Sequence, residues 1–279
     1  MECNILNDYN NYLTLHKRVS ENTRQSYMRD LRQLSAYLSI SIIDATSEHL
    51  LNYLHDQKQN GRSPATLSRN IASMKSFYSF LVKSCIRSDN PALTLTAEKK
   101  NAKLPQILTI EEVDLLLDQP RCTDLKGYRD KAMLEVLYSS GIRVSELIEL
   151  RISDICLENG TIICREKNKE RIISLQPTAV KALHEYIGFI RKQMIRNKNE
   201  ERLFVNINGD PMSRQGFWKL LKGYQNKAGI EKNITPHTLR HSFAAHMLQN
   251  GTDLNAIQHT LGHSNAATTQ MYLQILETG

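Results

Sequence analysis

Residues 235–272 read TPHTLRHSFAAHMLQNGTDLNAIQHTLGHSNAATTQMY, and the interpretation of the whole chain depends on this stretch. Thr235-Pro236 predicts a helix start, because threonine caps free backbone N–H groups and proline suits the first helical position. Asn250-Gly251 predicts the end of that helix. His237 and Arg240 then lie three residues apart on one helix face, where an imidazole and a guanidinium can hold an anionic oxygen from two sides.

The second half of the stretch adds further polar groups. We expect a short helix from Asp253, followed by Leu261-Gly262-His263-Ser264 and then by Thr268-Thr269, which lead to Tyr272. Taken singly, these residues have ordinary explanations, since a lone helical arginine is usually solvated and a lone tyrosine usually belongs to a core. Only the combination, in this order and at these separations, indicates a catalytic site.

The remainder of residues 107–279 predicts one mostly helical domain with a small β component. Thr109 to Glu112 form a capping box that opens a helix with Val113, Leu116 and Leu117 on its apolar side. The β-rich runs Thr161–Cys164 and Arg171–Leu175 flank a polar loop and predict a hairpin. A further short strand is expected at Leu203–Val205.

Residues 1–95 predict a separate helical domain, and the polar residues 96–106 predict a linker to the larger one. Helices are expected from Thr23, from Thr46 to Asn60-Gly61, and from Ser63-Pro64. The apolar stripe of the first consists of Tyr27, Leu31, Leu34 and Leu38. The stripe of the third consists of Leu67, Ile71, Met74, Tyr78 and Leu81, which leaves Thr66, Arg69, Asn70 and Ser73 on the opposite side.

Composition restricts the function classes. The net charge of +7 and the pI near 9.1 favour a polyanionic partner. The five cysteines are scattered and never form a C-x-x-C pair, which argues against a disulfide framework or a thiolate metal site. No secretory signal and no run of about 20 apolar residues is found, so we expect a cytoplasmic protein without a membrane partner.

Three motifs together resemble the tyrosine recombinases, most closely the Xer-type and phage-integrase branch. The 235–272 stretch is similar to their C-terminal signature, with H-x-x-R, L-G-H-S and a tyrosine nine residues after the last histidine. GIRVSEL, which contains Arg143, resembles the first catalytic arginine motif, and ICREKNKERIISL resembles the hairpin that carries the catalytic lysine. The resemblance implies an N-terminal helical core-binding (SAM-like) domain and a C-terminal α+β catalytic domain.

The resemblance also implies a role for each matching residue. Tyr272 attacks the scissile phosphorus and becomes a 3′-phosphotyrosine, while Arg143 and Arg240 hold the non-bridging oxygens. His263 bonds one of these oxygens, and His237 assists proton transfer near the nucleophile. The protonation of the leaving 5′-oxygen falls to Lys167, which aligns with the family's lysine through the shared N-K-E-R; Lys169 is the alternative.

Elementary chemistry is consistent with this division of roles. A free phenol has a pKa of ~10, so its attack at neutral pH needs a base or a field that favours the phenolate. Two guanidiniums and a histidine can stabilise the charge of a phosphoryl transition state in the way that Mg²⁺ does in other enzymes. Accordingly, we expect neither a metal ion nor another cofactor.

The expected partner is double-stranded DNA with a specific recombination site, bound by a homo- or hetero-tetramer on two such sites. Arg24, Arg32, Thr66 and Arg69 are candidate DNA contacts in the N-terminal domain, although each could equally belong to a solvated helix face. Seven residues follow Tyr272. Relatives of the resembled family carry a further C-terminal helix that docks on a neighbouring subunit, so we expect either a different assembly or a shortened chain.

Other functions remain open at this stage. His237/His241 and His259/His263 have the i,i+4 spacing of a zinc-chelating pair, but no H-E-x-x-H motif is present and Arg240 lies beside the first pair. A non-catalytic DNA-binding regulator, a type IB topoisomerase and a telomere-resolving enzyme are further alternatives. The sequence does not separate chromosome-dimer resolution from integration or excision of a mobile element.

Overall fold

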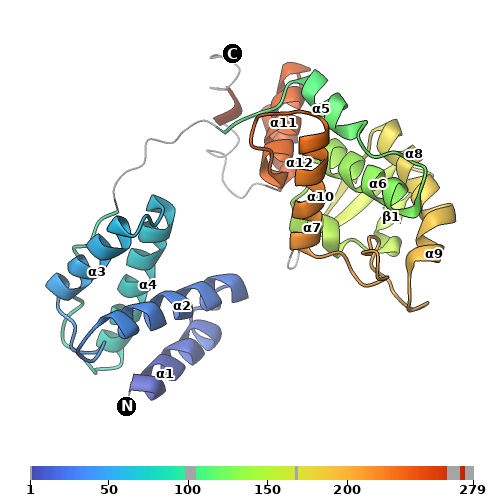
Figure 1. The fold of residues 1–279 in the computed structure, drawn as a ribbon. Helices are drawn as coiled ribbons and strands as arrows, with labels where there is room; N and C mark the ends of the chain where they lie inside the picture. Colours follow the sequence, from blue (N-terminus) through green and yellow to red (C-terminus); the bar gives the residue numbers. More distant parts are fainter. Residues whose placement is uncertain (1, 98–104, 167–168, 263–270, 274–279) are drawn as a thin grey trace. The chain divides into compact units, whose positions relative to one another are not determined.

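The computed structural model describes residues 2–97, 105–166, 169–262 and 271–273. The chain divides into two compact units, Met1–Ala102 and Lys103–Gly279, each with its own hydrophobic core (Figure 1). In the described residues no helix combines the length and the apolar character needed to cross a bilayer.

The described residues of the N-terminal unit form four helices, shown in blue to cyan in Figure 1. Their bounds are α1 Glu2–Leu15, α2 Glu21–Tyr37, α3 Ser47–Gln59 and α4 Pro64–Lys83. The side chains of Ser20, Thr46 and Ser63 cap the starts of α2, α3 and α4. The predicted helices from Thr46 and Ser63 are confirmed, whereas α2 begins two residues before Thr23 and ends before Leu38. Helix α1 was not singled out by the sequence patterns.

Helix α4 is buried on more than one side. It contacts α1, α2 and α3, so it forms the centre of the bundle. Asn70 and Ser73 are 1% and 0% exposed. The sequence placed these two residues opposite the apolar stripe, and the structure shows that this side of the helix is also buried where they lie, because an apolar stripe does not reveal a second packing surface lined with small polar side chains.

The remaining helices of the described residues all lie in the C-terminal unit. The first are α5 Ile110–Leu117, α6 Leu125–Ser140 and α7 Val144–Glu149, and the short 3₁₀ helix η1 Ile152–Asp154 follows. After the sheet come α8 Pro177–Glu185, the π-helical turn η2 Tyr186–Ile190, α9 Arg191–Met194, α10 Arg214–Lys227, α11 Pro236–Gln249 and α12 Leu254–Leu261. Helix α6 is buried along most of its length and contacts α5, α7, α8 and α11, so it organises this unit.

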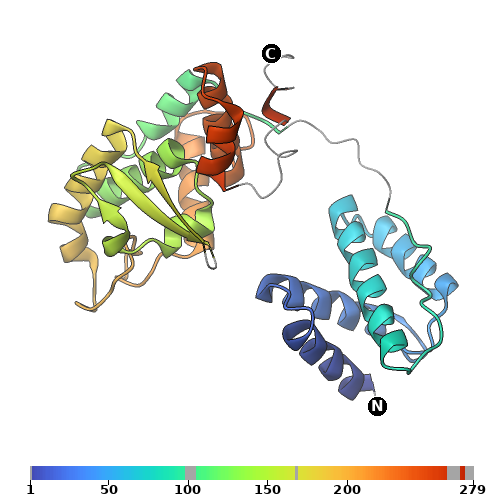
Figure 2. The ribbon, with the colours of Figure 1, turned by 180° about the vertical axis from the view of Figure 1, so that it is seen from behind.

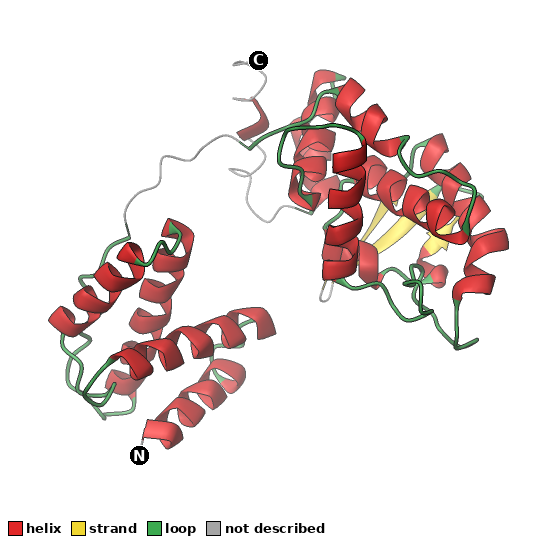
Figure 3. Cartoon of the chain, viewed as in Figure 1, coloured by secondary structure: helices red, strands yellow, loops and turns green. Residues whose placement is uncertain are grey.

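The sheet of this unit has three antiparallel strands in the order β1-β2-β3, drawn as arrows in Figures 2 and 3. They are β1 Ile155–Cys156, β2 Thr161–Glu166 and β3 Lys169–Ser174. In the register of β2 and β3, Ile162 pairs with Ile173 and Cys164 pairs with Arg171. The predicted hairpin is confirmed, but its strands extend further into the polar segment than expected.

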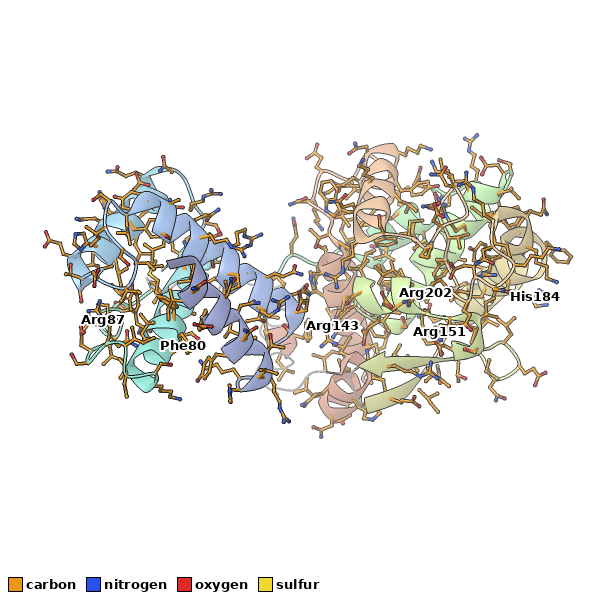
Figure 4. All side chains as sticks on the ribbon, turned by 90° about the horizontal axis from the view of Figure 1, so that it is seen from below. Phe80, Arg87, Arg143, Arg151, His184 and Arg202 are labelled. Carbon is orange, nitrogen blue, oxygen red and sulfur yellow. The ribbon has the colours of Figure 1, made fainter. Side chains whose placement is uncertain are left out.

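The short strand expected at Leu203–Val205 was wrong. This segment takes part only in isolated bridges, Val205 with Pro211 and the adjoining Arg202 with Arg151. Arg151 and Arg202 are labelled in Figure 4. Leu203, Phe204 and Val205 are all fully buried, so their apolar, β-rich composition reflects the core and not a strand.

Candidate active site

Helix α11 places Arg240 in the interior of the C-terminal unit. Thr235 caps this helix, since its hydroxyl accepts a hydrogen bond from the backbone N–H of Thr238 at 3.1 Å, and Pro236 occupies the first turn. Arg240 lies one turn later and is 4% exposed. The capping signal in the sequence therefore fixes where along the helix this buried cation lies.

Main-chain carbonyls hold the Arg240 guanidinium. Nη1 donates to the Gly141 carbonyl and Nη2 to the Leu261 carbonyl, both at 2.6 Å. Burial and the nearby Arg143 charge lower the pKa of Arg240 to about 10, so it remains a cation at neutral pH. Burial is the larger of the two causes, and the Arg143 charge beside it means that an anion bound here would meet two cations in a shielded place.

Arg143 approaches the same region from the start of α7. Its Nη2 donates to the Gly262 carbonyl at 3.2 Å, next to the carbonyl that Arg240 holds, and its Nη1 lies 3.6 Å from Glu146 Oε1. Arg143 is labelled in Figure 4. Two guanidiniums predicted from motifs about 100 residues apart are thus brought together at the C-terminal end of α12.

A glycine makes this meeting possible. Gly141 ends α6 with a φ of +59°, and a Cβ at this position would lie 2.3 Å from Phe243 of α11. Only glycine combines the left-handed conformation with so close an approach. The turn that leads to Arg143 therefore packs directly on the helix that carries Arg240.

Tyr272 is fully buried against α11. Its ring lies in a small core with Phe243, Ile257 and Leu261, and its hydroxyl lies 2.8 Å from Nδ1 of His241. Burial raises the pKa of Tyr272 to about 12, although the Arg240 cation acts to lower it. Burial, together with the charges of His237 and Arg240, lowers the pKa of His241 to about 4. At neutral pH the pair is therefore a neutral phenol bonded to a neutral imidazole.

His241 was missed as a site residue by the sequence analysis. It was considered only as half of a chelating pair, because the H-x-x-R spacing directs attention to His237. His237 is an exposed residue whose pKa is lowered by partial desolvation and by Arg240 and Arg143. The two imidazole rings lie 6.5 Å apart between centroids, and the one recorded beside the Tyr272 hydroxyl belongs to His241. The adjacency of His241 to Arg240 in the sequence was the one available signal.

Two predicted site residues cannot be placed. Lys167 and His263 lie outside the described residues, as does the side chain of the alternative lysine, Lys169. Their assignments stay predictions. Among the residues that are described, no three histidine, cysteine, aspartate or glutamate side chains form a group able to hold a metal ion.

The candidate DNA contacts of the N-terminal unit have different surroundings. Arg32 is exposed. Arg24 is hydrogen-bonded to Glu21 at 2.6 and 2.8 Å and also to Asn10 of α1. The Thr66 hydroxyl lies 3.0 Å from that of Ser63. Arg69 forms two hydrogen bonds, at 2.8 and 2.9 Å, to Asp30, which is 2% exposed.

Arg69 therefore has a structural role whether or not it touches DNA. Replacement of Arg69 by alanine would leave the buried Asp30 carboxylate without its guanidinium partner, so we expect a loss of about 1–2 kcal/mol in unfolding free energy, allowing for the solvent contact of Arg69. Urea denaturation measures this loss. The double variant Arg69→Ala/Asp30→Asn is the control, since removing the buried charge should recover part of the stability.

The same substitution also tests the DNA contact. If Arg69 binds a phosphate, the double variant Arg69→Ala/Asp30→Asn should lack that contact even though part of its stability is recovered. The slope of log Kd for DNA against log salt concentration should then be smaller by about one than in the wild type. An unchanged salt slope in that variant would exclude Arg69 from the DNA contacts.

The neutral state of His241 leads to a pH dependence of stability. The pKa of this histidine is about 4 in the folded protein, below its ordinary value near 6.5, so the unfolded chain takes up the proton first as the pH falls. Acidification from pH ~7 to ~5 should therefore destabilise the DNA-free protein, with about 1 kcal/mol attributable to this half-buried ring.

Thermal unfolding at both pH values, compared with the variant His241→Asn, isolates this contribution from those of His237 and His246, whose pKa values are also lowered. An equal pH dependence in the variant would contradict the assignment.

The two-unit architecture and the residues of the site together indicate a class of enzyme. A helical N-terminal unit, and a C-terminal unit in which two arginines converge beside a buried tyrosine, are the features of a tyrosine recombinase. Comparison with known proteins agrees. A model of the phage integrase family matches residues 106–278, and one of the phage integrase N-terminal SAM-like domain matches residues 6–84.

Full-length relatives are also found. Tyrosine recombinase XerD of Oceanobacillus iheyensis is 45% identical over 277 residues, which is 97% of this chain and 93% of the relative. The XerD of Halalkalibacterium halodurans is 41% identical over 281 residues, with 99% and 94% covered. The chain belongs to the phage integrase family and is a tyrosine-type site-specific recombinase. This confirms the resemblance seen in the sequence.

Solved structures share the fold. The Tn1549 transposon integrase in complex with a circular intermediate DNA has a TM-score of 0.77 at 21% identity, covering 96% of this chain and 94% of that one. XerH recombinase bound to a palindromic difH substrate has a TM-score of 0.75 at 24% identity, with 90% and 76% covered. XerA recombinase has a TM-score of 0.56 at 28% identity, with 98% and 93% covered.

Proposed function

We propose that this recombinase cleaves DNA by attack of the Tyr272 phenol on a backbone phosphate held by Arg143 and Arg240. The observation that carries the proposal is the convergence of the two guanidiniums on the adjacent carbonyls of Leu261 and Gly262, with Arg240 close enough to Tyr272 to lower its pKa. A guanidinium has five N–H donors, and the two carbonyls that hold Arg240 use two of them, so Arg240 keeps donors that can meet phosphate oxygens.

The bonds balance without an external energy source. The Tyr272 oxygen forms a bond to phosphorus, the P–O5′ bond breaks, and the 3′-phosphotyrosine keeps the phosphodiester energy for the reverse step. The phenol loses its proton and the 5′-oxygen gains one. We assign the donation of this second proton to Lys167 on the hairpin. His263 bonds a non-bridging oxygen. No nucleotide triphosphate or metal ion enters these steps.

His241 is proposed as the imidazole that receives or positions the phenol proton, with His237 in support. Its low pKa in the DNA-free protein is caused in part by the Arg240 cation. A bound phosphate would offset that charge and raise the pKa of His241. In this scheme the nucleophile becomes easier to deprotonate only when its substrate is bound.

We propose double-stranded DNA with a specific recombination site as the partner, and a homo- or hetero-tetramer on two sites as the working assembly. The solved structures of XerH and of the Tn1549 integrase are complexes of those proteins with a palindromic difH substrate and with a circular intermediate DNA. The predicted organisation, with a DNA-binding domain at 1–95, a linker at 96–106 and a catalytic domain at 107–279, would let both domains contact the duplex. Arg24, Arg32, Thr66 and Arg69 are the candidate contacts in the first. A cytoplasmic location fits a chromosomal or mobile-element substrate.

Strand exchange between two DNA sites tests this function. With a chelator present throughout, we expect four-way junctions and recombinant products from two labelled duplexes that carry the cognate site, found by selection from a library of inverted repeats. Relaxation of supercoiled plasmid without exchange would instead favour a topoisomerase. Binding without cleavage would favour a non-catalytic regulator, and loss of cleavage on chelation would favour a metal enzyme.

A further inference from the structure

Three arginines, not two, meet at the C-terminal end of α12. Arg171 Nε donates to the Thr260 carbonyl at 2.9 Å, Arg240 to Leu261, and Arg143 to Gly262, so three consecutive carbonyls each meet a guanidinium from a different element. The last carbonyls of a helix lack partners within the helix and carry partial negative charge. The proposed chemistry uses only two of these arginines, which leaves Arg171 to be explained.

Arg171 is also bonded to the acid that holds Arg143. Its Nη1 lies 2.8 Å from Glu146 Oε1, and its Nη2 donates to Glu146 Oε2 at 3.0 Å. The same Oε2 accepts the backbone N–H of Arg143 at 2.7 Å. The Arg171 and Glu146 side chains are 9% and 8% exposed. A planar fork, a carboxylate and a second arginine thus form one shielded chain of contacts.

The charge state of Glu146 agrees with this arrangement. Burial raises the pKa of its carboxyl, but the hydrogen bonds from Arg171 and from the Arg143 backbone, and the charges of both arginines, outweigh burial and hold it below its ordinary value. Glu146 is therefore ionised at neutral pH. An ionised carboxylate between two guanidiniums fixes the position of both.

Gly262 brings the third element into contact. It ends α12 with a φ of +65°, and a Cβ at this position would lie 3.1 Å from Arg171 Nη1 and 3.2 Å from its Cζ. The guanidinium of Arg171 therefore packs on the face of the glycine whose carbonyl binds Arg143. A side chain at this position would require Arg171 to shift by a few tenths of an ångström.

We propose that Arg171 is a positioning residue for strand cleavage, which orients Arg143 through Glu146 and fixes the end of α12 through Thr260 and Gly262. The inference rests on the proposed function, since it takes Arg143 as a phosphate ligand. Arg171 lies on β3, in the hairpin that carries Lys167. The guanidinium of Arg171 thereby joins the hairpin to α7 and α12 at once. Without it Arg143 would be held less firmly, and a shift of Arg143 by a fraction of an ångström should slow the chemical step.

The test compares Arg171→Lys with Arg165→Lys. Arg165 is a matched control because it lies on the other strand of the same hairpin and also pairs with carboxylates, those of Asp154 and Glu170, but is 47% exposed. With DNA saturating, we expect Arg171→Lys to slow single-turnover cleavage of a suicide substrate by about 10- to 100-fold, with an unchanged Kd, and Arg165→Lys to cleave as the wild type does.

A double variant tests whether Arg171 and Glu146 act through the same contact, and thermal unfolding shows whether the variants are folded in the cleavage assay. Glu146→Gln alone should also slow cleavage, and Arg171→Lys/Glu146→Gln should be no slower than the slower single variant, because both act through the same contact. Multiplying effects would overturn the proposal. A lower amplitude with an unchanged rate constant in folded Arg171→Lys would show only loss of active protein and would also overturn it.

A substrate with sulfur at the bridging 5′ position shows which group Arg171 assists. A thiolate leaves without a proton donor, so the defect of Arg171→Lys should persist on this substrate if Arg143 is the group affected. Full recovery would assign Arg171 to the hairpin lysine and overturn the proposal. A covalent adduct from the wild type in the same experiment shows that the proposed function holds, whichever result Arg171→Lys gives.

Discussion

Replacement of Tyr272 by phenylalanine is expected to abolish the covalent protein–DNA adduct that the wild type forms on nicked suicide substrates. The substitution removes from a fully buried ring only the oxygen that we propose as the nucleophile. Without that oxygen no other group near the two arginines is assigned to attack phosphorus, so the loss should be complete and not partial. Denaturing gel electrophoresis of labelled DNA measures the adduct directly.

Tyr138→Phe is the matched control for this experiment. The Tyr138 hydroxyl lies 2.8 Å from Nδ1 of His246, so the control also removes a phenolic hydroxyl that is bonded to an imidazole of α11, in this case from a partly buried ring. Its ring packs on the same small core as that of Tyr272. We expect the control to form the adduct. Adduct formation by Tyr272→Phe would show that another residue is the nucleophile.

Replacement of Arg240 by lysine is expected to slow cleavage by about 10²–10³, equivalent to ~3–4 kcal/mol of transition-state stabilisation. Lysine keeps the positive charge but lacks the planar guanidinium fork. In Arg240 this fork bonds the Gly141 and Leu261 carbonyls and at the same time can present further N–H groups to a phosphate. Single-turnover rates with saturating DNA measure the effect, and DNA binding should weaken much less than the rate.

Arg191→Lys provides the matched control, because Arg191 is another buried arginine bonded to main-chain carbonyls. It is 4% exposed and donates to the carbonyls of Glu200, Arg202 and Leu203. Both substitutions therefore disturb a buried guanidinium of the same unit, and both can lower its stability. Equal loss of the cleavage rate in the two variants would indicate general destabilisation and would contradict a role of Arg240 at the phosphate.

Local signals in the sequence were sufficient for the starts of α3, α4, α5 and α11 and for the hairpin. Capping residues such as Thr46, Ser63, Thr109 and Thr235 act on the N–H groups of their own first turn, so their effect can be predicted without knowing the fold. The prediction of a strand at Leu203–Val205 was wrong because it depends on contacts that are not local. A short apolar run is compatible with a strand or with any buried segment, and the neighbours that decide between them are distant in the sequence.

The resemblance of the motifs to a known family also predicted Arg143, Arg240 and Tyr272 as site residues, and the structure places both arginines at the C-terminal end of α12 and Tyr272 against α11. The sequence did not predict His241 as the partner of the Tyr272 hydroxyl, because that contact spans 31 residues and depends on how the tyrosine packs against α11. Nor did it predict that Arg69 pairs with the buried Asp30, since the helix face alone suggested a solvent-exposed cation.

The sequence by itself determined the order and spacing of the residues predicted to carry the reaction, which are a tyrosine, two arginines and a lysine between two β-rich runs. The tertiary structure decided how these groups are held. Three arginines share the free carbonyls of α12, Glu146 joins two of them, and His241 meets the tyrosine. These contacts join residues up to 119 positions apart. Their energies depend on burial and distance, which exist only after the chain has folded.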